Sequence, residues 1–424
     1  MPRILIVSDS ASVKFGGEAI LPFHYFRVLR QRNYPVWLLV HSRTRDELST
    51  LFNNDPNIFY VEDTAFHRSL YKLGTWLFPE KVAHYTIGFV SRLITQFAQR
   101  RLARILIAEE RIDIVHQPMP VSPREPSMMY GLGVPVVIGP MNGAMTYPPA
   151  FRKRESWLVR STIAVGRQLS DTMNFLIPGK LRSSLLLVAN ERTRKGLPGR
   201  IRGKVAELVE NGVDMQVWSI DEVSDPPSHN ELLVLVFIGR LIDFKSVDLL
   251  LEAFRNSVND SPMTLTIVGD GPMRSTLEEM AQHWGILANA EGVAGKVFFS
   301  GWLSQAECSQ TLRRSDSLVF PSLFDCGGAV VLEAMAAGRA VIASYWGGPA
   351  DYVDDECGIL VHPSSQSDFI SGLSDAMILL AKSPGLARTL GKRGRQKVAK
   401  HFDWEVKVDH MLNHYDSVLT AKTL

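Results

Sequence analysis

Short apolar runs rich in Val and Ile alternate with segments of helical periodicity along most of the chain. A first series predicts strands at 4–8, 36–40, 57–61, 112–116, 135–139, 184–189 and 205–210. A second series predicts strands at 232–239, 265–269, 297–301, 317–322, 340–344 and 358–362. Uniformly apolar strands separated by helices are typical of parallel sheets that are covered on both faces. The pattern therefore predicts an α/β protein with two Rossmann-like, doubly wound domains.

The boundary between the two domains is predicted from a polar segment. Residues 219–230 contain a Pro pair and show no hydrophobic periodicity, so they are interpreted as a linker. This places an N-terminal domain at 1–218 and a C-terminal domain at 231–401. The last helical run, 402–424, is expected to pack back toward the N-terminal domain.

Composition narrows the class of protein. A length of 424 residues suits two or three domains of about 150 residues each. The net charge of +2 gives no overall electrostatic field for nucleic acid. The first apolar run, ILIVS, is too short for a signal peptide, and no apolar stretch reaches the roughly 20 residues of a spanning helix. Cys308, Cys326 and Cys357 lack metal-binding spacing, which favours a cytoplasmic location.

The most informative stretch is 321–353. Asp325 and Glu333 flank the glycine pair Gly327 and Gly328, which precedes a strong helix-forming run and then an apolar strand. Bare backbone N–H groups at such a helix N-terminus bind anions. The two acids can therefore address one ligand that is anionic at one point and rich in hydroxyl groups at another.

Two cations follow a predicted strand in the C-terminal half. Arg240 and Lys245 come directly after 232–239, and strand ends of open parallel sheets face the ligand crevice. Cations at this edge suit a diphosphate leaving group; the alternative is a solvated loop with surface cations. Near the N-terminus, Gly16 and Gly17 allow close approach of backbone to a ligand, or simply form a tight turn.

A lone histidine, His116, ends the predicted strand 112–116. Such a residue is either a structural histidine whose hydrogen bonds are made within the protein, or one that forms a hydrogen bond with a sugar hydroxyl. The Gly/Pro loop 139–149 either lines an acceptor site or only connects elements. No DxD motif ends a strand, so a metal-chelated diphosphate of that type is not supported and no metal site is predicted. No cofactor is predicted either. The Arg-rich segments 67–110 and 151–160 are candidates for contact with an anionic membrane face, or are solvated helices.

Taken together, these motifs resemble the retaining nucleotide-sugar glycosyltransferases of group 1, which have the two-domain GT-B fold. The resemblance spans nearly the whole chain and is carried by FGGEA, IDIVH, ENGVD, FIGRLIDFKSVDLLLEAF, IVGDGPMR, FFSGWLSQAE and the block at 321–353. It implies two Rossmann-like domains that face a central cleft. It also implies a nucleotide-diphosphate sugar as donor.

The resemblance assigns roles to matching positions. Arg240 and Lys245 are similar to the family's diphosphate clamp, and Glu333 to the acid that holds the ribose. Asp325 matches the acid that contacts the donor sugar, and His116 the histidine near the reacting sugar. The implied catalytic residues are His116, Asp325, Arg240 and Lys245. The implied donor-binding residues are Gly16, Gly17, Arg240, Lys245, Asp325, Gly327, Gly328, Ala329, Val330 and Glu333.

Two departures from the family pattern stand out. The first acid is Asp325 where the family usually has Glu, and Cys-Gly-Gly follows where Pro-Phe-Gly is common. Ser246 follows Lys245 where the family usually has Gly. Because every charge is kept, we interpret these changes as variation in specificity.

The function expected from the sequence is transfer of a sugar, with retained configuration and without a metal, to a glycan or lipid-linked acceptor. Polysaccharide or surface-glycan biosynthesis is the expected context, with a cytoplasmic enzyme that contacts the inner face of the membrane peripherally. Alternatives are a nucleotide-sugar epimerase, a glycan phosphorylase with a pyridoxal-phosphate lysine, and a non-catalytic nucleotide-sugar-binding protein.

Overall fold

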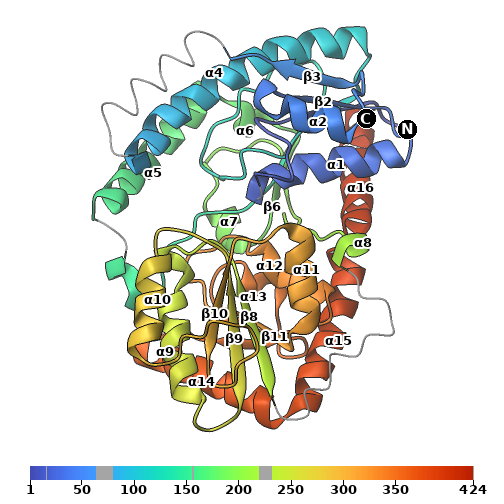
Figure 1. Cartoon of the computed structure of the whole chain (residues 1–424). Coiled ribbons are helices and arrows are strands. Elements are labelled where there is room, and N and C mark those ends of the chain that lie inside the picture. Colours follow the sequence, from blue (N-terminus) through green and yellow to red (C-terminus); the bar gives the residue numbers. More distant parts are fainter. Residues whose placement is uncertain (16, 64–79, 155–156, 219–231, 424) are drawn as a thin grey trace. The chain divides into compact units, whose positions relative to one another are not determined.

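The computed structural model describes residues 1–15, 17–63, 80–154, 157–218 and 232–423. Residue contacts divide the chain into two compact units, coloured along the sequence in Figure 1. Unit 1 comprises 1–144, 157–210 and 407–424, and unit 2 comprises 145–156 and 211–406. The units thus differ from the predicted domains in assigning 145–156, 211–218 and 402–406 to unit 2. The predicted linker, 219–230, lies outside the described residues.

Unit 1 is built on a seven-stranded sheet in the order β3-β2-β1-β4-β5-β6-β7. All the pairs are parallel; Ile4 of β1, for example, aligns with Val36 of β2 on one side and with Ile114 of β4 on the other. The strands are β1 (Ile4–Val7), β2 (Val36–His41), β3 (Ile58–Val61), β4 (Ile114–Gln117), β5 (Val136–Met141), β6 (Leu185–Val188) and β7 (Lys204–Glu207). These strands confirm the first predicted series.

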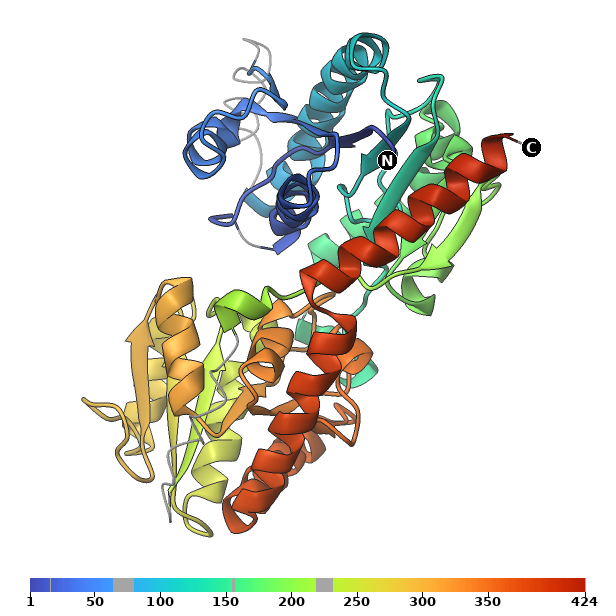
Figure 2. The same ribbon diagram turned by 90° about the vertical axis from the view of Figure 1, so that its right-hand side faces the viewer.

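Helices cover both faces of the sheet of unit 1 and exclude water from its apolar strands. They are α1 (Ile20–Gln31), α2 (Arg45–Leu51), α4 (Glu80–Glu109), α5 (Trp157–Leu176), α6 (Gly179–Arg182) and α7 (Glu191–Lys195), with 3-10 turns η1 (Gly17–Ala19) and η2 (Ser42–Thr44). Ala103 and Leu106 of α4 pack into a core with side chains of β1, β2, β4, β5 and β6. The last helix, α16 (Trp404–Thr423), adds its residues from Lys407 onward to this unit (Figure 2).

Unit 2 repeats the same plan with a six-stranded parallel sheet in the order β10-β9-β8-β11-β12-β13. Its strands are β8 (Leu233–Ile238), β9 (Met263–Val268), β10 (Val297–Gly301), β11 (Ser317–Phe320), β12 (Ala340–Ser344) and β13 (Ile359–Val361). They confirm the second predicted series. In both units the chain order of the first six strands is 3-2-1-4-5-6, which is the order of a dinucleotide-binding fold.

Figure 1 shows α9, α10 and α14 on one face of the unit 2 sheet and α11, α12 and α15 on the other. The helices of this unit are α8 (Met215–Trp218), α9 (Val247–Ser257), α10 (Arg274–His283), α11 (Gln305–Arg314), α12 (Ala329–Ala336), α13 (Pro349–Tyr352), α14 (Gln366–Lys382) and α15 (Pro384–His401), with 3-10 turns η3 (Pro149–Arg154) and η4 (Asp243–Lys245). Ser304 begins α11 with a capping box in which Glu307 is the partner, as the sequence SQAE favours. In the part of the chain that is described, no helix is both long and apolar enough to cross a bilayer.

Candidate functional site

The order in which strands are added to the unit 2 sheet reverses between β8 and β11. The loops that follow these two strands carry the predicted donor residues. In open α/β sheets the ligand crevice lies outside the carboxyl ends of the strands at this switch point. Strand β8 leads to Arg240 and Lys245, and β11 leads to Asp325 and the glycine pair. The topology therefore brings together residues that lie about 80 positions apart, because Lys245 and Asp325 differ by 80 in sequence.

Lys245 and Asp325 form an ion pair across this switch point. Their side chains are 14% and 19% exposed, so the pair is shielded on most sides. The Lys245 ammonium also lies 4.6 Å from the centroid of the Phe320 ring, a cation–π contact. The backbone joins the two loops as well, since the Leu323 N–H donates to the Phe244 carbonyl at 2.8 Å. The predicted sugar-contacting acid and the predicted phosphate-binding cation are thus neighbours.

Arg240 takes a different position in the same loop. It is exposed, and within the described residues its guanidinium makes neither an ion pair nor a hydrogen bond. An exposed, unpaired guanidinium at a strand end retains all its donors for an oxyanion. Of the two predicted clamp residues, Arg240 is therefore the one with a free charge.

Ser246 follows the cationic loop and adopts a left-handed backbone conformation, with φ of 54° and ψ of 38°. Glycine reaches this region without the steric cost that a side chain imposes. This explains physically why the resembling family usually has Gly here. In this protein Ser246 itself adopts the left-handed conformation directly before α9.

The glycine pair forms the N-terminus of α12. Gly328 has φ of 68° and a Cβ there would lie 3.1 Å from a ring carbon of Phe320. The run AVVLEAMA then continues as helix, because Ala, Leu, Glu and Met are strong helix formers. The first amides of a helix have no partner within it. Ala329 and Val330 therefore offer N–H groups beside Asp325, where an anion would be stabilised.

A second glycine pair, Gly347 and Gly348, packs on the same loop and was not singled out from the sequence. Gly348 donates its N–H to the Asp325 carbonyl at 2.9 Å. A Cβ on Gly348 would lie 2.0 Å from the Gly327 carbonyl oxygen, and one on Gly347 would lie 2.3 Å from the Asp325 carbonyl oxygen. The loop after β12 thus packs against the backbone of the loop that carries Asp325 and Gly327. The available signal was a Gly-Gly pair separated by two residues from the end of a predicted strand.

Glu333 lies in the second turn of α12 and is half-buried. Burial of its carboxyl group raises its pKa from 4.5 to about 7. Desolvation disfavours the charged form, so a ligand that donates hydrogen bonds to this carboxylate would relieve that cost. A ribose diol is a donor of that kind, which agrees with the predicted role.

The tail of the predicted 139–149 loop lies in unit 2 beside these residues. Tyr147 stacks on Phe324 with ring centroids 5.0 Å apart, and the Trp346 indole N–H donates to the Thr146 carbonyl at 2.9 Å. Phe324 directly precedes Asp325. The loop therefore supports the neighbourhood of the predicted sugar-contacting acid.

The surroundings of His116 disagree with its predicted contact to the reacting sugar. The residue is the penultimate one of β4 in unit 1 and is fully buried. Its Nε2 donates to the Gly139 carbonyl at 2.7 Å, which fixes the tautomer, and its Nδ1 accepts from the Tyr415 hydroxyl at 2.7 Å. Burial lowers its pKa to about 4, so the ring is neutral. With both nitrogens engaged inside the protein, His116 has the contacts of a structural residue.

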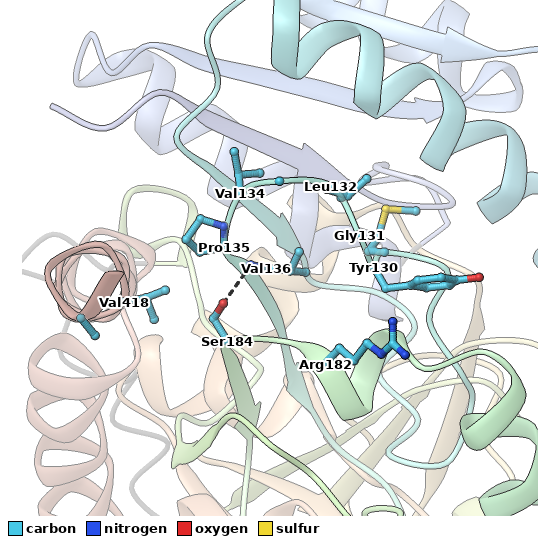
Figure 3. A pocket seen from close by; sticks show the side chains of 12 residues that line it. Tyr130, Gly131, Leu132, Val134, Pro135, Val136, Arg182, Ser184 and Val418 are labelled. Carbon is cyan, nitrogen blue, oxygen red and sulfur yellow. Dashed lines mark hydrogen bonds between the residues drawn. The ribbon is translucent and has the colours of Figure 1, made fainter. Parts of the chain in front are cut away.

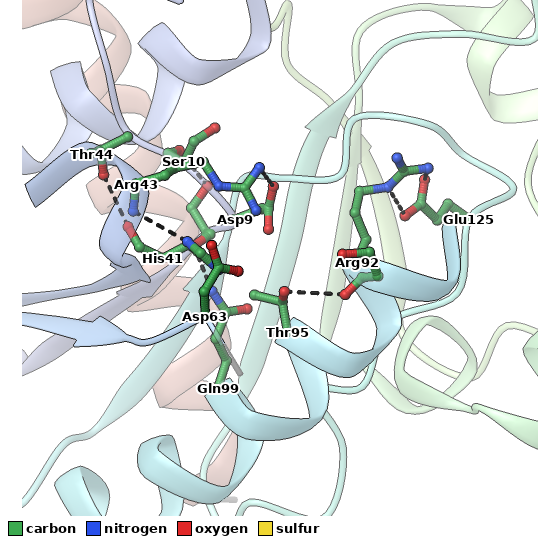
Figure 4. Close-up of polar contacts among 12 residues, drawn as sticks. Asp9, Ser10, His41, Arg43, Thr44, Asp63, Arg92, Thr95, Gln99 and Glu125 are labelled. Carbon is green, nitrogen blue, oxygen red and sulfur yellow. Dashed lines mark hydrogen bonds and ion pairs between the residues drawn. The ribbon is translucent and has the colours of Figure 1, made fainter. Parts of the chain in front are cut away.

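The carboxyl edge of the unit 1 sheet carries a set of polar side-chain pairs, among them ion pairs (Figure 4). Asp9 pairs with Arg43 at 3.5 Å, and His41 with Asp63 at 3.2 Å. Arg92 of α4 holds Glu125 through two hydrogen bonds of 2.9 and 3.2 Å. Sequence reasoning missed these pairs because their members lie on different elements, far apart in the chain.

The two predicted glycines of unit 1 have different outcomes. Gly17 begins η1 with φ of 53°, and a Cβ there would meet nothing within 4 Å, so the position is open toward a ligand. Gly16 lies outside the described residues.

Elsewhere in unit 1, a hollow of about 450 Å³ is lined by Tyr130, Val136, Arg182 and Val418 among others (Figure 3). Because β5 begins at Val136, this hollow lies at the opposite edge of the sheet from the loops described above.

No group of three or more His, Cys, Asp or Glu side chains within the described ranges is arranged to hold a metal ion.

Comparison with known proteins defines the class of fold first. Over 98% of this chain, the structure is similar to that of Anabaena Alr3699/HepE in complex with UDP and glucose, with a TM-score of 0.64 and 14% identity over the whole of that chain. A glycosyltransferase from Rickettsia africae is similar over 99% of both chains, with a TM-score of 0.65 and 14% identity. The fold is thus GT-B, as predicted.

The family is then given by sequence. Residues 233–378 match the model of glycosyl transferases group 1. The chain is 28% identical over 200 residues to the glycogen synthase of Mycobacterium tuberculosis, covering 47% of this chain and 45% of the relative. It is 28% identical over 219 residues to the D-inositol 3-phosphate glycosyltransferase of Kribbella flavida, covering 49% and 50%. The chain spans about half the length of these relatives. Residues 233–378 thus match a group 1 glycosyltransferase domain, which agrees with the predicted group 1 family over this part of the chain.

Proposed function

We propose that the protein transfers a sugar from a nucleotide-diphosphate sugar to a glycan or lipid-linked acceptor, with retention of configuration. The observation that carries the proposal is the switch point of unit 2. There an ion-paired Lys245–Asp325, a free Arg240 and the N-terminus of α12 stand together. The matching structures bound to UDP and to UDP-glucose support a donor of this class.

The donor contacts follow from the chemistry of each group. Glu333 accepts hydrogen bonds from the ribose hydroxyls. The amides of Ala329 and Val330 and the guanidinium of Arg240 hold the diphosphate. Lys245 lies between that diphosphate and Asp325, and Asp325 accepts hydrogen bonds from the donor sugar. Fixed positive charge of this kind stabilises a departing diphosphate without a metal ion.

The reaction balances as a substitution at the anomeric carbon. The bond from that carbon to the phosphate oxygen breaks, and the nucleoside diphosphate leaves with the electron pair. The acceptor oxygen forms the new bond from the same face. Its proton goes to the departing phosphate oxygen, so configuration is retained. The contacts of His116 argue for support of the sheet edge rather than for contact with the sugar.

For the acceptor we propose a glycan or lipid-linked sugar of polysaccharide or surface-glycan biosynthesis, used by a cytoplasmic enzyme that contacts a membrane peripherally. Exposed apolar side chains on the helices of unit 1 support the membrane contact. Leu169, Phe175 and Leu176 on α5 are 52%, 66% and 69% exposed, and Phe97 on α4 is 60% exposed. Co-sedimentation with anionic liposomes tests this part, and full recovery in the supernatant at low salt would contradict it.

The experiment that tests the donor chemistry is incubation with UDP-, GDP-, ADP- and TDP-sugars, with and without EDTA, followed by phosphorus NMR. Slow release of nucleoside diphosphate from one donor, unchanged by EDTA, is the expected result. Loss of activity in EDTA would overturn metal independence alone. Neither binding nor release of any donor would overturn the proposed function. Conversion of donor to an isomeric nucleotide sugar would identify an epimerase instead.

A further inference from the structure

The loop between β1 and α1 follows the first strand of unit 1 at its carboxyl end, beside β4. This is the switch point of the unit 1 sheet, where a ligand is expected by the same topological rule as in unit 2. The base of the loop is buried, with Ala11 and Ser12 at 0% exposure. Its tip is exposed, with Val13 at 37% and Phe15 at 58%. The tip is therefore accessible to a substrate bound at this edge.

One carboxylate from another element holds this tip. Glu47 of α2 accepts from the Ser12 hydroxyl at 2.5 Å through Oε2. Its Oε1 accepts from the N–H groups of Val13 at 2.9 Å and Lys14 at 3.2 Å. The Ser12 hydroxyl oxygen in turn accepts from the N–H groups of Lys14 at 3.0 Å and Phe15 at 3.1 Å.

Three successive amides, those of residues 13–15, thus converge on the Ser12 hydroxyl and the Glu47 carboxylate. Successive backbone N–H groups that point to one place form a concavity that binds anions. In this protein the anion at the concavity is the carboxylate of Glu47. The loop is also closed at its base, because Ser12 donates its N–H to the Ala19 carbonyl at 3.0 Å. Glu47 consequently fixes the tip relative to α2 rather than leaving it to sample many conformations.

We propose that Glu47 is a positioning residue for the transfer reaction, acting through residues 12–15 to hold Lys14 and Phe15 against the substrate at the unit 1 switch point. The inference rests on the proposed function and names a residue which that function does not use. Glu47 touches no reacting atom; it fixes a loop that does contact substrate. The nucleoside diphosphate contacts proposed above come from unit 2, so its affinity should change less than transfer does, although the predicted donor-binding Gly17 follows this tip.

The chain offers a matched control on the same turn of α2. Asp46 also lies in the first turn of the helix, is exposed, and has no side-chain hydrogen bond or ion pair among the described residues. Asp46→Ala therefore removes the same charge from the same helix end without touching the loop. Glu47→Gln keeps an oxygen that accepts from the two N–H groups but cannot accept the Ser12 hydroxyl proton at its other end.

The experiment compares wild type, Glu47→Ala, Glu47→Gln and Asp46→Ala in three measurements. These are steady-state transfer with the donor found above, nucleoside diphosphate affinity by calorimetry, and amide hydrogen exchange of residues 13–15. For Glu47→Ala we expect kcat/KM for transfer to fall between about tenfold and a hundredfold, the scale of a misplaced substrate-contacting group. Exchange of the loop amides should rise, and nucleoside diphosphate affinity should change less than kcat/KM. Glu47→Gln should fall between wild type and Glu47→Ala.

Asp46→Ala should stay within about twofold of wild type, as expected for an exposed charge. The inference is overturned if folded Glu47→Ala transfers sugar as well as Asp46→Ala, or if its loop amides exchange as in wild type. A wild-type protein that neither binds nor turns over any nucleotide sugar instead contradicts the proposed function. The amide exchange then still decides whether Glu47 holds the loop.

Discussion

The two switch points have the same strand order but are built from different kinds of contact. In unit 2 the edge between β8 and β11 presents charge to a ligand, through Arg240, the Lys245–Asp325 pair and the α12 amides. In unit 1, at the edge between β1 and β4, the polar groups form hydrogen bonds with other groups of the protein. Both ring nitrogens of His116 form hydrogen bonds within the protein, and the Glu47 carboxylate accepts hydrogen bonds from the amides of the loop after β1.

The difference indicates that the two units have different roles in binding the substrates. Unit 2 offers unpaired donors at fixed positions, which suits a ligand part that is always the same, such as a nucleoside diphosphate. Unit 1 uses internal hydrogen bonds to set loop shape, which suits a ligand part recognised through the surface of that loop. Substitutions at the unit 2 edge should therefore act on chemistry, and those at the unit 1 edge on positioning and stability.

The largest effect is expected at Arg240. Arg240→Ala removes the free guanidinium that we assign to the departing diphosphate, so turnover should fall by about two orders of magnitude or more. Turnover is measured at saturating donor, with thermal unfolding as a check of the fold. Lys392→Ala, which removes an exposed cation on α15, is the matched control. Normal turnover in folded Arg240→Ala would break the assignment of unit 2 as the chemical half.

Next in size is the pH dependence caused by Glu333. Its pKa is raised from 4.5 to about 7 in the folded protein, so the folded state binds more protons than the unfolded state between these values. Wild type therefore loses stability at this site as the pH rises from 4.5 to 7. Glu333→Gln should be more stable than wild type at pH 8 by at most about 3 kcal/mol, with little difference at pH 4. Urea unfolding at several pH values measures this difference; a difference that does not vary with pH would contradict it.

A smaller effect is expected where two loops of unit 2 touch. Gly348→Ala would place a Cβ 2.0 Å from the Gly327 carbonyl oxygen, so the backbone behind the anion-binding loop must move. Overpacking of this kind costs about 1–3 kcal/mol, and donor affinity should weaken with it. The comparison variant is Gly385→Ala on α15, where an added Cβ would meet nothing within 4 Å. Equal stability and equal donor affinity of both variants would show that the second glycine pair does not shape the site.

The same contrast explains what could be predicted from the sequence. The strands follow from continuous apolar runs, and those of both sheets were placed correctly because parallel strands are buried on both faces. The donor residues of unit 2 lie in two short segments, 240–245 and 325–333, directly after strands. Strand order then brings those two segments together, so local pattern and topology were enough.

The contacts of unit 1 could not be predicted in this way. Glu47 meets Ser12 across 35 residues, Arg92 meets Glu125 across 33, and His116 meets Tyr415 across 299. Nothing in the sequence near His116 indicates that a tyrosine of the last helix donates to its ring. A histidine at a strand end looks the same whether it faces a ligand or the interior, and packing of remote elements decides between the two.

The last and smallest prediction tests that packing. The carbonyl oxygen of Gly139 can only accept, so Nε2 of His116 carries the proton and Nδ1 accepts from the Tyr415 hydroxyl. Tyr415→Phe leaves Nδ1 buried without a donor, which costs about 1–2 kcal/mol in the free energy of unfolding. Because the His116 pKa is lowered to about 4 by burial, stability at this site falls as the pH drops from 6.5 toward 4 in both proteins. The destabilisation should therefore appear at pH 7 by urea unfolding, while donor turnover per folded molecule stays normal. A stable variant with strongly reduced turnover would place His116 in the chemistry and remove the contrast between the two edges.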